Sequence, residues 1–523
     1  MRGFCGFKDR ARGLFACEVA QFSAISPHGA RKPGMSVPIR LSAAALGRLP
    51  ATVSRPGYDR RALRRGIVHI GMGGFHRAHM ARYTHDLMER RADVLAWGIC
   101  GVGLMPGDVQ LGQALAPQDR LYTLVERDRE GEHATVIGSV VQTLFAPAEA
   151  AALAAALDDP ATRIVSLTVT EAGYCLDPGT KRLNLGDPLI VHDLAHRDAP
   201  QSAVGIIVAA LRRRRDARAG AFTALSCDNI QHNGDVLARA VRDLAAAQEP
   251  ALARWIDDCA SFPNTMVDRI TPVTQPEDVA HFAARYGYQD AWPVFAESFR
   301  QWVIEDRFVA GRPPWEEVGV QFAADVTPYE KMKLRLLNAS HLAISAPGEL
   351  AGYARIDEAM CDPRLRAYMA ALMDRETGPT IEAPAAIDLA AYKAELIRRF
   401  ANPAIRDTTA RVNRDAPLNY LLDPLRDRMR AGQDSPLLLY ALAAWIRRLR
   451  GQDDRGKAIE VRHPMGEMLR PLAGADVLDI EPLFGDLAGH PLLASGVSDW
   501  LAAMRRHGTL GALGRYQEAG VIG

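Results

Sequence analysis

A strand that runs into a glycine-dense turn and then into a long helical pattern is the feature that most constrains this chain. Residues 66–88 read G-I-V-H-I-G-M-G-G-F-H-R-A-H-M-A-R-Y-T-H-D-L-M, so a short β-branched strand at 67–70 precedes three glycines. Glycines in this context let the backbone approach a pyrophosphate over a helix N-terminus. His76 stands where the dinucleotide motif has its third glycine, and a turn that only connects a strand to a helix is the alternative interpretation. The residues expected to contact the cofactor here are Gly71, Gly73, Gly74, Phe75 and His76.

Further strands alternate with alanine-rich helical stretches. Alternation of this kind predicts an α/β domain of the Rossmann type, a doubly wound parallel sheet with helices on both faces. Ligands in such sheets bind at the carboxyl ends of the strands, where three polar clusters stand at 170–175, 226–234 and 266–272, although helix capping is the better explanation of each cluster by itself. The predicted strands are 97–102, 163–170, 221–226 and, less clearly, 205–210, and the helices between them include 148–157 and 235–247.

The second strand favours NAD as the cofactor. In such folds an acidic group beyond this strand holds the hydroxyls of the adenosine ribose, and Asp108 is the acid that follows it most closely. Asp108 lies farther from the glycine turn than the usual spacing of about 20 residues. No Arg or Lys occurs between Val102 and Gln118, so nothing local is available to bind a 2′-phosphate.

A well-marked helix is predicted at 327–346, T-P-Y-E-K-M-K-L-R-L-L-N-A-S-H-L-A-I-S-A. Its T-x-x-E start, from Thr327, predicts a capping box with proline at the first helical position. In an α-helical register Lys333 and His341 share one largely apolar stripe, with the amide of Asn338 beside it. Burial penalises a charged lysine and lowers its pKa from about 10.4 toward neutrality, so that it can take a proton from an alcohol. The alternative is that Lys333 snorkels to the surface and His341 is a core histidine.

Composition excludes several classes of partner. A net charge of +1 and the lack of a basic block with interleaved aromatic residues argue against nucleic acid. The longest apolar run, 437–446, is shorter than the roughly 18 residues that span a bilayer, so no membrane partner is expected. The seven cysteines are far apart and form no C-x-x-C pair, which favours reduced thiols, a cytoplasmic location and no bound metal.

The 523 residues are too many for a single core, and two domains are the simplest organisation. Residues 1–49 fit poorly with the rest of the chain, and we expect a partly disordered extension in which Met35 is the natural start. Residues 50–322 are expected to form the NAD-binding domain. From about residue 323 the periodicity is helical, with helices at 365–373, 389–400, 436–449 and 499–506, so 323–523 is predicted to be a mainly α-helical domain that binds the substrate.

Five motifs together resemble the long-chain mannitol dehydrogenase family. They are G-x-G-G-F-H-R-A-H, T-E-x-G-Y-C, S-C-D-N, F-P-N-x-M-V-D-R-I-T-P and K-x-x-x-x-N-x-x-H, and the similarity runs from about residue 66 to 352. The resemblance implies metal-independent oxidoreduction between a Rossmann-type domain and a helical domain. It also implies the roles of individual residues: Lys333 as the base, Asn229 and Asn338 as oxyanion donors, His341 as a positioning group, Asp268 as a substrate contact and Glu171 as part of a proton path.

The chain departs from the family pattern near the far end of the substrate. Asn419 stands where family members have a lysine, while Arg411 is expected to hold a distal hydroxyl. The resemblance therefore predicts a cytoplasmic, monomeric NAD-dependent polyol dehydrogenase, with oxidation of D-mannitol to D-fructose as the expected reaction. A hexuronate reductase of the fructuronate type, with Arg411 or Arg414 facing the carboxylate, is the first alternative. A protein that senses NAD(H) without turnover is the second.

Overall fold

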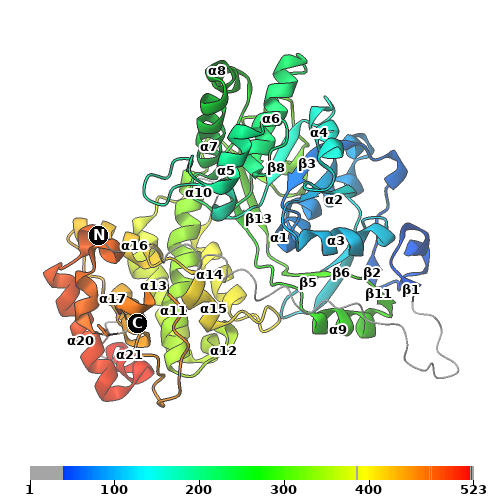
Figure 1. Ribbon diagram of the computed structural model, residues 1–523. Helices are drawn as coiled ribbons and strands as arrows, with labels where there is room; N and C mark the ends of the chain where they lie inside the picture. The colour runs from blue at the N-terminus through cyan, green and yellow to red at the C-terminus, as the bar shows by residue number, and fades with distance from the viewer. Residues whose placement is uncertain are drawn as a thin grey trace, which may run out of the picture.

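The computed structural model describes residues 39–384, 387–463, 465–469, 471–472, 474–518 and 520. Among the described residues, strands and helices alternate in the first part of the chain and only helices follow from residue 327, and the two parts lie side by side in Figure 1. Most of the predicted extension, including Met35, lies outside the described residues. The described end of that stretch is ordered by pairing, because β1 (Ile39–Arg40) lies parallel to β11 (Tyr288–Gln289).

The main sheet has five parallel strands in the order β7-β4-β3-β8-β9. By position along the chain this is the order 3-2-1-4-5 of a dinucleotide-binding fold, with β3 in the centre. The strands predicted at 67–70, 97–102, 163–170 and 221–226 are all confirmed, with shifted ends. The strands are β3 (Arg65–Ile70), β4 (Gly98–Gly103), β7 (Val140–Phe145), β8 (Ile164–Leu167) and β9 (Thr223–Ser226).

Helices cover both faces of this sheet, as predicted. Val68 and Ile70 of β3 pack in one apolar cluster, with residues of α4 (Ala150–Asp158), α6 (Ala203–Asp216) and α7 (Asn233–Gln248). Ile67 points to the opposite face and packs in a second cluster that includes α2 (Met80–Arg90). Successive side chains of a strand point to opposite faces, so the central strand is buried on both sides.

The strand predicted at 205–210 is wrong, because these residues lie inside α6. The helix begins after Ser202, whose hydroxyl accepts a hydrogen bond from the backbone N–H of Gly205 at 2.8 Å. A short, continuous apolar run is equally consistent with a buried strand and with a buried helix. All residues of this run are buried in the structure, so the pattern of apolar residues could not distinguish a helix from a strand.

Smaller sheets extend the first part of the chain toward the helices. One has the order β12-β5-β6-β2 and another the order β10-β13-β14. The first consists of β12 (Val294–Glu297), β5 (Tyr122–Arg127), β6 (Glu132–Ile137) and β2 (Val53–Ser54), and the second of β10 (Thr265–Asp268), β13 (Gln301–Glu305) and β14 (Gln321–Ala323). Strands β10 and β12 both end beside the helical part, because Arg399 of that part contacts Asp268 and Glu297, their last residues.

The second part of the chain is built around α11 (Ala339–Leu350), which is almost wholly buried. Figure 1 shows it in the middle of the helical layer, and its neighbours include α15 and α17. All four helices predicted after residue 360 are confirmed. The helices packed in this part include α12 (Ile356–Cys361), α13 (Pro363–Leu372), α14 (Leu389–Phe400), α15 (Thr409–Asp415), α16 (Asn419–Arg430), α17 (Pro436–Arg448), α20 (Pro491–His507) and α21 (Thr509–Glu518).

The helix predicted at 327–346 is present, but it is not one regular α-helix. It consists of α10 (Thr327–Met332), a π-helical turn (Lys333–Asn338) and α11. The predicted capping box is wrong as well. Asp325 caps the start by accepting from the Thr327 N–H at 2.8 Å, and Glu330 accepts from the N–H of His232 at 3.0 Å.

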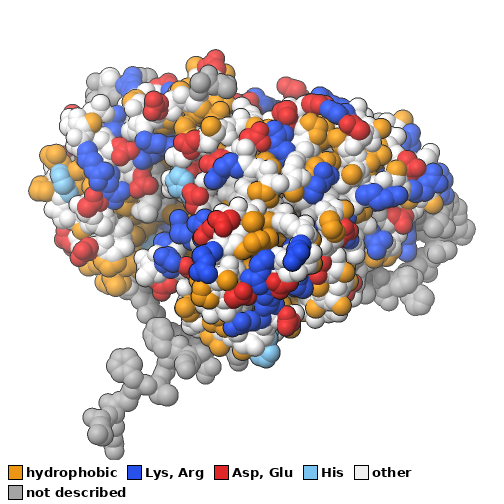
Figure 2. Space-filling model, turned by 90° about the horizontal axis from the view of Figure 1, so that it is seen from above, with side chains coloured by type: hydrophobic (Ala, Val, Ile, Leu, Met, Phe, Trp, Pro, Cys, Tyr) orange, Lys and Arg blue, Asp and Glu red, His pale blue; other side chains and the backbone are white. Residues whose placement is uncertain are grey.

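Charges of both signs are mixed over the face of the molecule shown in Figure 2, where Lys and Arg side chains alternate with Asp and Glu. Among the described residues, no helix combines the length and the apolar character needed to cross a membrane.

Candidate active site

Lys333 lies at the start of the π-helical turn with its ammonium group buried between the two parts of the chain. Its Nζ donates to Oδ1 of Asn229, which follows β9, and to the carbonyl oxygen of Val267 in β10 at 2.8 Å. Only 8% of the residue is exposed. Burial lowers the pKa of Lys333, the nearby charge of Asp268 opposes that shift, and the charge of Arg399 adds to it.

The π-helical turn brings Lys333 and Asn338 onto one side of the helix. A π-helix closes its hydrogen bonds over five residues, as the N–H of Ala339 does here with the carbonyl of Leu334. Lys333 and Asn338 are five residues apart, so this geometry stacks them about one turn apart. Turns of this kind interrupt α-helices frequently at functional sites.

A second buried cation, Arg399 of α14, reaches the ends of two strands of the first part. Its Nη1 and Nη2 donate to Asp268 at 2.7 and 2.9 Å, and its Nε and Nη2 donate to Glu297 at 2.8 and 2.7 Å. The side chain is 2% exposed. Burial alone would raise the pKa of Asp268, but the charge and the hydrogen bonds of Arg399 outweigh it and hold that pKa below its ordinary value. Asp268, the predicted substrate contact, therefore has both carboxylate oxygens on a guanidinium.

His341 lies one helical turn beyond Asn338, with its ring against Phe400 at 4.9 Å between centroids. Its Nε2 is 3.2 Å from Oδ2 of Asp407. Arg411, the other predicted substrate contact, places Nε and Nη2 on the same carboxylate at 2.6 Å each. Asp407 therefore lies between His341 and Arg411.

The predicted proton-path residue, Glu171, lies at the edge of this group. Its side chain is 65% exposed and forms an ion pair with Lys181 at 3.1 Å. Tyr420, at the start of α16, lies between Glu171 and Asn338. Its hydroxyl is hydrogen-bonded to Asn338, and burial and the charge of Glu171 raise its pKa. Tyr420 follows directly after Asn419, the position where the family lysine was expected.

The glycine turn after β3 has the shape that a bound dinucleotide requires. Gly71 has a φ of +88°, and a Cβ at this position would lie 2.1 Å from the carbonyl oxygen of Thr168. At Gly73 and Gly74 a Cβ would meet no protein atom closer than 3.9 and 3.7 Å. Space therefore lies open over these two residues, at the carboxyl end of the central strand, where a pyrophosphate would approach the backbone.

Beneath this turn, His76 is 1% exposed and stacks on His69 with 3.4 Å between ring centroids. Both ring nitrogens of His76 are buried without a hydrogen-bond partner, as is Oγ1 of Thr271 opposite Gly74. Buried polar atoms normally have partners. Phe75, the remaining predicted contact, stacks on His79 at 4.8 Å.

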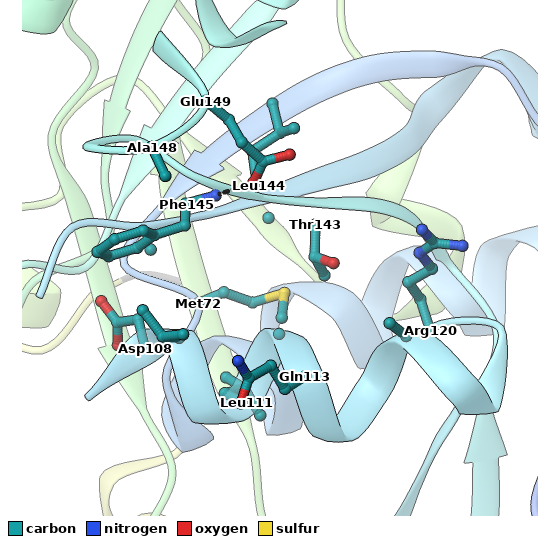
Figure 3. Close-up of a pocket in the computed structure, with 15 residues that line it drawn as sticks. Met72, Asp108, Leu111, Gln113, Arg120, Thr143, Leu144, Phe145, Ala148 and Glu149 are labelled. Atoms are coloured by element: carbon teal, nitrogen blue, oxygen red, sulfur yellow. Dashed lines mark hydrogen bonds between the residues drawn. The ribbon is translucent and has the colours of Figure 1, made fainter. Parts of the chain in front are cut away.

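A pocket of about 420 Å³ lies between α3 (Asp108–Leu115) and β7, at the end of β4 (Figure 3). Asp108 stands at one end of it and Arg120 at the other, with Met72 between them. Oδ2 of Asp108 accepts from the N–H groups of Leu104 and Met105 at 2.8 Å each, so the aspartate also shapes the loop that follows β4. Arg120 was not predicted as a local cation, because it comes just after the stretch 103–117.

Four groups around Lys333 and His341 were not predicted. Arg399 had a readable signal, since it falls on the same helical face as Tyr392, Leu396 and Phe400, where an arginine needs a buried partner. The carbonyl of Val267, the side chain of Asp407 and the hydroxyl of Tyr420 carried none. Among the described residues, no group of three or more His, Cys, Asp or Glu side chains is arranged to hold a metal ion.

A 3-2-1-4-5 parallel sheet with an open glycine turn, followed by helices that carry a buried lysine, defines a dinucleotide-dependent dehydrogenase. The chain belongs to the mannitol dehydrogenase family. The family model described as the mannitol dehydrogenase Rossmann domain matches residues 65–317, and the one described as the mannitol dehydrogenase C-terminal domain matches residues 325–504.

Relatives of two activities are similar to this chain. The D-mannonate oxidoreductase of Escherichia coli (strain K12) is 45% identical over 418 residues, which cover 79% of this chain and 86% of that protein. A mannitol 2-dehydrogenase of Aspergillus fumigatus is 42% identical over 468 residues, covering 86% of this chain and 93% of the relative.

Two solved structures agree with this placement. The mannitol 2-dehydrogenase of Pseudomonas fluorescens, solved as a ternary complex with NAD and D-mannitol, is 40% identical with a TM-score of 0.82 and covers 92% of this chain and 100% of that one. A D-sorbitol dehydrogenase in substrate-free form is 35% identical with a TM-score of 0.83, covering 91% and 100%. The comparisons confirm the predicted family, the predicted fold class and the prediction of an NAD-dependent polyol dehydrogenase.

Proposed function

We propose that this protein oxidises D-mannitol to D-fructose with NAD, and that Lys333 is the general base. The observation that carries the proposal is the environment of Nζ. A neutral amine has two N–H donors and one lone pair. Both donors are engaged, by Asn229 and by the carbonyl of Val267, so the lone pair is what remains to accept a proton. The lowering of the Lys333 pKa by burial makes that neutral form accessible.

The residues around Lys333 supply the rest of the chemistry. Because Oδ1 of Asn229 accepts from Lys333, its amide N–H groups are left to donate to the substrate oxygen. Asn338, about one turn away, is the second donor, and two such donors stabilise the alkoxide that develops as Lys333 takes the hydroxyl proton. Gly71, Gly73 and Gly74 would hold NAD, which would supply the acceptor for the hydride of the carbinol carbon. His341 holds the substrate so that the hydroxyl meets Lys333.

We further propose the division of labour predicted from the sequence. Residues 50–322 would hold the nucleotide on Gly71, Gly73 and Gly74, and residues 323–523 would supply Lys333 and the substrate contacts. The contacts of Lys333 and Arg399 with strand ends of the other part support a site between the two. Such a site excludes water, which strengthens each electrostatic interaction within it.

A hexuronate is the second candidate substrate, because the relative from Escherichia coli is named as a D-mannonate oxidoreductase. A carboxylate substrate needs a cation that faces it. Arg411 is occupied by Asp407, and Arg414 lies 2.7 Å from Asp415. These two pairs leave the predicted cations neutralised, which favours an uncharged polyol.

The test is oxidation of NADH by the purified protein with D-fructose, D-xylulose, L-sorbose and D-fructuronate, repeated with NADPH and after treatment with a chelator. We expect turnover of D-fructose that survives chelation. Turnover of D-fructuronate alone would reject the polyol in favour of the uronate. Binding of NADH without turnover of any substrate would instead indicate a nucleotide sensor and reject the proposed reaction.

A further inference from the structure

The side chain of Asp407 contacts both His341 and Arg411, for which separate roles were predicted from the sequence. Its Oδ2 lies 3.2 Å from Nε2 of His341, and Arg411 donates to Oδ1 and Oδ2 at 2.6 Å each. The carboxylate is 9% exposed and the imidazole 12%. The three side chains therefore form a short row that starts beside Asn338 and ends at the surface, where Arg411 is 46% exposed.

The backbone around Asp407 is fixed from both sides. Its carbonyl accepts from the N–H of Ile356 at 3.0 Å. The next residue, Thr408, caps α15 by accepting from the N–H of Arg411 at 3.2 Å. The carboxylate thus has little freedom to move away from the imidazole. Arg411 approaches it as a fork, a geometry that matches the two oxygens of a carboxylate.

The charge state of Asp407 follows from these contacts. Burial alone would raise its pKa, but the hydrogen bonds from His341 and Arg411 outweigh burial and hold the pKa of this carboxyl well below its ordinary value. An ionised carboxylate can only accept hydrogen bonds. A bare ring nitrogen 3.2 Å from this oxygen would set two acceptors against each other, so the contact favours the neutral tautomer with its hydrogen on Nε2, which leaves Nδ1 as an acceptor.

We propose that Asp407 is a positioning residue that fixes the Nε2–H tautomer of His341, so that Nδ1 accepts a hydrogen bond from a substrate hydroxyl, and that Arg411 acts by holding Asp407 rather than by touching the substrate. The inference rests on the proposed function, in which His341 holds the substrate. It replaces the predicted role of Arg411 as a substrate contact. The proposal also defines the group that this part of the site recognises. This group is a substrate hydroxyl, next to the carbinol that is oxidised, which donates a hydrogen bond to His341.

The kinetics of three variants test the proposed roles of Asp407 and Arg411. Asp407→Leu removes the acceptor at similar size, and we expect kcat/KM for the polyol to fall roughly 10- to 100-fold, the range typical of residues that orient a ligating histidine. Asp407→Asn can turn its carbonyl oxygen to Nε2–H and should recover most of that loss. Arg411→Lys keeps a positive charge beside Asp407 but loses the fork, so the loss should be smaller than with leucine. Affinity for NADH should not change in any of them.

The matched control is Asp362→Leu. Asp362 is likewise buried and receives Nε and Nη2 of an arginine, Arg364, at 3.1 and 2.7 Å, but it lies at the start of α13 and not beside His341. Its variant should keep the wild-type kcat/KM. If Asp407→Leu retained wild-type kcat/KM, or lost no more than Asp362→Leu, the proposal would be overturned.

A second readout does not depend on turnover. Two-bond ¹H–¹⁵N correlation spectra distinguish the two imidazole tautomers, and comparison with His341→Gln identifies the signal of His341. We expect the Nε2–H pattern in the wild-type protein and a mixture of tautomers in Asp407→Leu. An Nδ1–H pattern in the wild-type protein would overturn the inference even if the polyol activity were real, and the Nε2–H pattern would support it even if the substrate proved to be another compound.

Discussion

Arg399 holds Asp268 in a two-pronged contact, with Nη1 2.7 Å from Oδ2 and Nη2 2.9 Å from Oδ1. The same guanidinium reaches Glu297, so one side chain of α14 joins the ends of β10 and β12. Its plane also lies over the ring of Phe299 at 4.0 Å. All of these charges are out of contact with water. Such an ion cluster contributes little net stability when intact, but removing one partner leaves uncompensated buried charge.

Arg399→Met should therefore destabilise the protein strongly. Two carboxylates would remain buried without their cation, and breaking a buried pair in this way costs about 3–5 kcal/mol. The measurement is the midpoint of urea or thermal unfolding at pH 7. Adding Asp268→Asn and Glu297→Gln to the same chain should recover part of the loss, since the buried negative charges are then gone.

The neighbouring residue provides the control for this prediction. Arg398 pairs with Glu395 at 2.6 Å on the surface of the same helix, and its side chain is 45% exposed. Exposed pairs contribute about 0–1 kcal/mol. Arg398→Met should leave the unfolding midpoint nearly unchanged, and an equal effect of the two variants would show that Arg399 does not act through its buried carboxylates.

Four of the five strands of the parallel sheet were predictable from the sequence because each carries a local signal, whereas β7 was not predicted. β-Branched runs such as 67–70 and 163–170 are bounded by turns. The glycines after the first strand indicate the edge of the sheet at which the cofactor is expected to bind. The wrong strand at 205–210 shows the limit of this reasoning. Helix α6 is apolar on all sides over these residues, so its sequence shows neither the two-residue period of a strand nor the 3.6-residue period of an amphipathic helix. In the sheet β10-β13-β14, strand β14 has only three residues and pairs with β13, and so short a segment carries no strand pattern of its own.

Of the site, the residues on one helix were predictable and the contacts between elements were not. The spacing of Lys333, Asn338 and His341 indicated a common side, although the register came from an α-helix and the structure has a π-helical turn there. The partners of Lys333 come from residues 229 and 267, more than 60 positions away. Such contacts depend on tertiary packing, and no local pattern encodes them.

The glycine turn gives a prediction in which two adjacent glycines behave differently. At Gly71 a Cβ would strike the carbonyl oxygen of Thr168 and the backbone is left-handed, so Gly71→Ala should lower both stability and NADH affinity. At Gly73 the nearest protein atom is 3.9 Å away, so Gly73→Ala should fold normally and lose NADH affinity alone, because the methyl group enters the space over the turn.

NADH fluorescence titration and thermal unfolding separate these two effects. Gly47→Ala is the control, since a Cβ there meets nothing within 4 Å, and Gly47 lies in a short helical turn before β2, outside the glycine turn. Unchanged NADH affinity in Gly73→Ala would mean that the nucleotide does not pass over this residue.

Lys333→Ala should lose polyol oxidation by several orders of magnitude and keep NADH binding, because the variant lacks the base but retains the glycine turn. Lys333→Met fills the same space without a charge. The pKa of Lys333 is lowered by burial, so its charged form costs stability at every pH below that pKa, and the cost falls as the pH rises toward 10.4. Lys333→Met should accordingly unfold at a higher temperature than the wild-type protein at pH 7. Near wild-type turnover in Lys333→Ala would disprove the proposed mechanism.

The pH dependence of the two directions should be opposite. Polyol oxidation needs neutral Lys333, so kcat/KM should rise tenfold per pH unit below the pKa of Lys333 and level off above it. Ketose reduction needs the protonated amine, so its kcat/KM should be constant below that pKa and fall above it. The inflection should lie below about 10.4, the ordinary value for lysine, because burial lowers this pKa. Parallel profiles for oxidation and reduction would point to a different titrating group.

Arg399 ties this profile to the buried cluster. Its charge lowers the pKa of Lys333, and its contact with Asp268 screens a carboxylate that raises the same pKa. Removing the guanidinium takes away the first effect and frees the second, so both changes favour the charged lysine. In Arg399→Met the rise of polyol oxidation should therefore move to higher pH, whereas in Arg398→Met it should stay in place. A shift to lower pH would mean that Asp268 becomes protonated when its partner is lost, and that the cluster controls the charge of the carboxylate rather than that of the base.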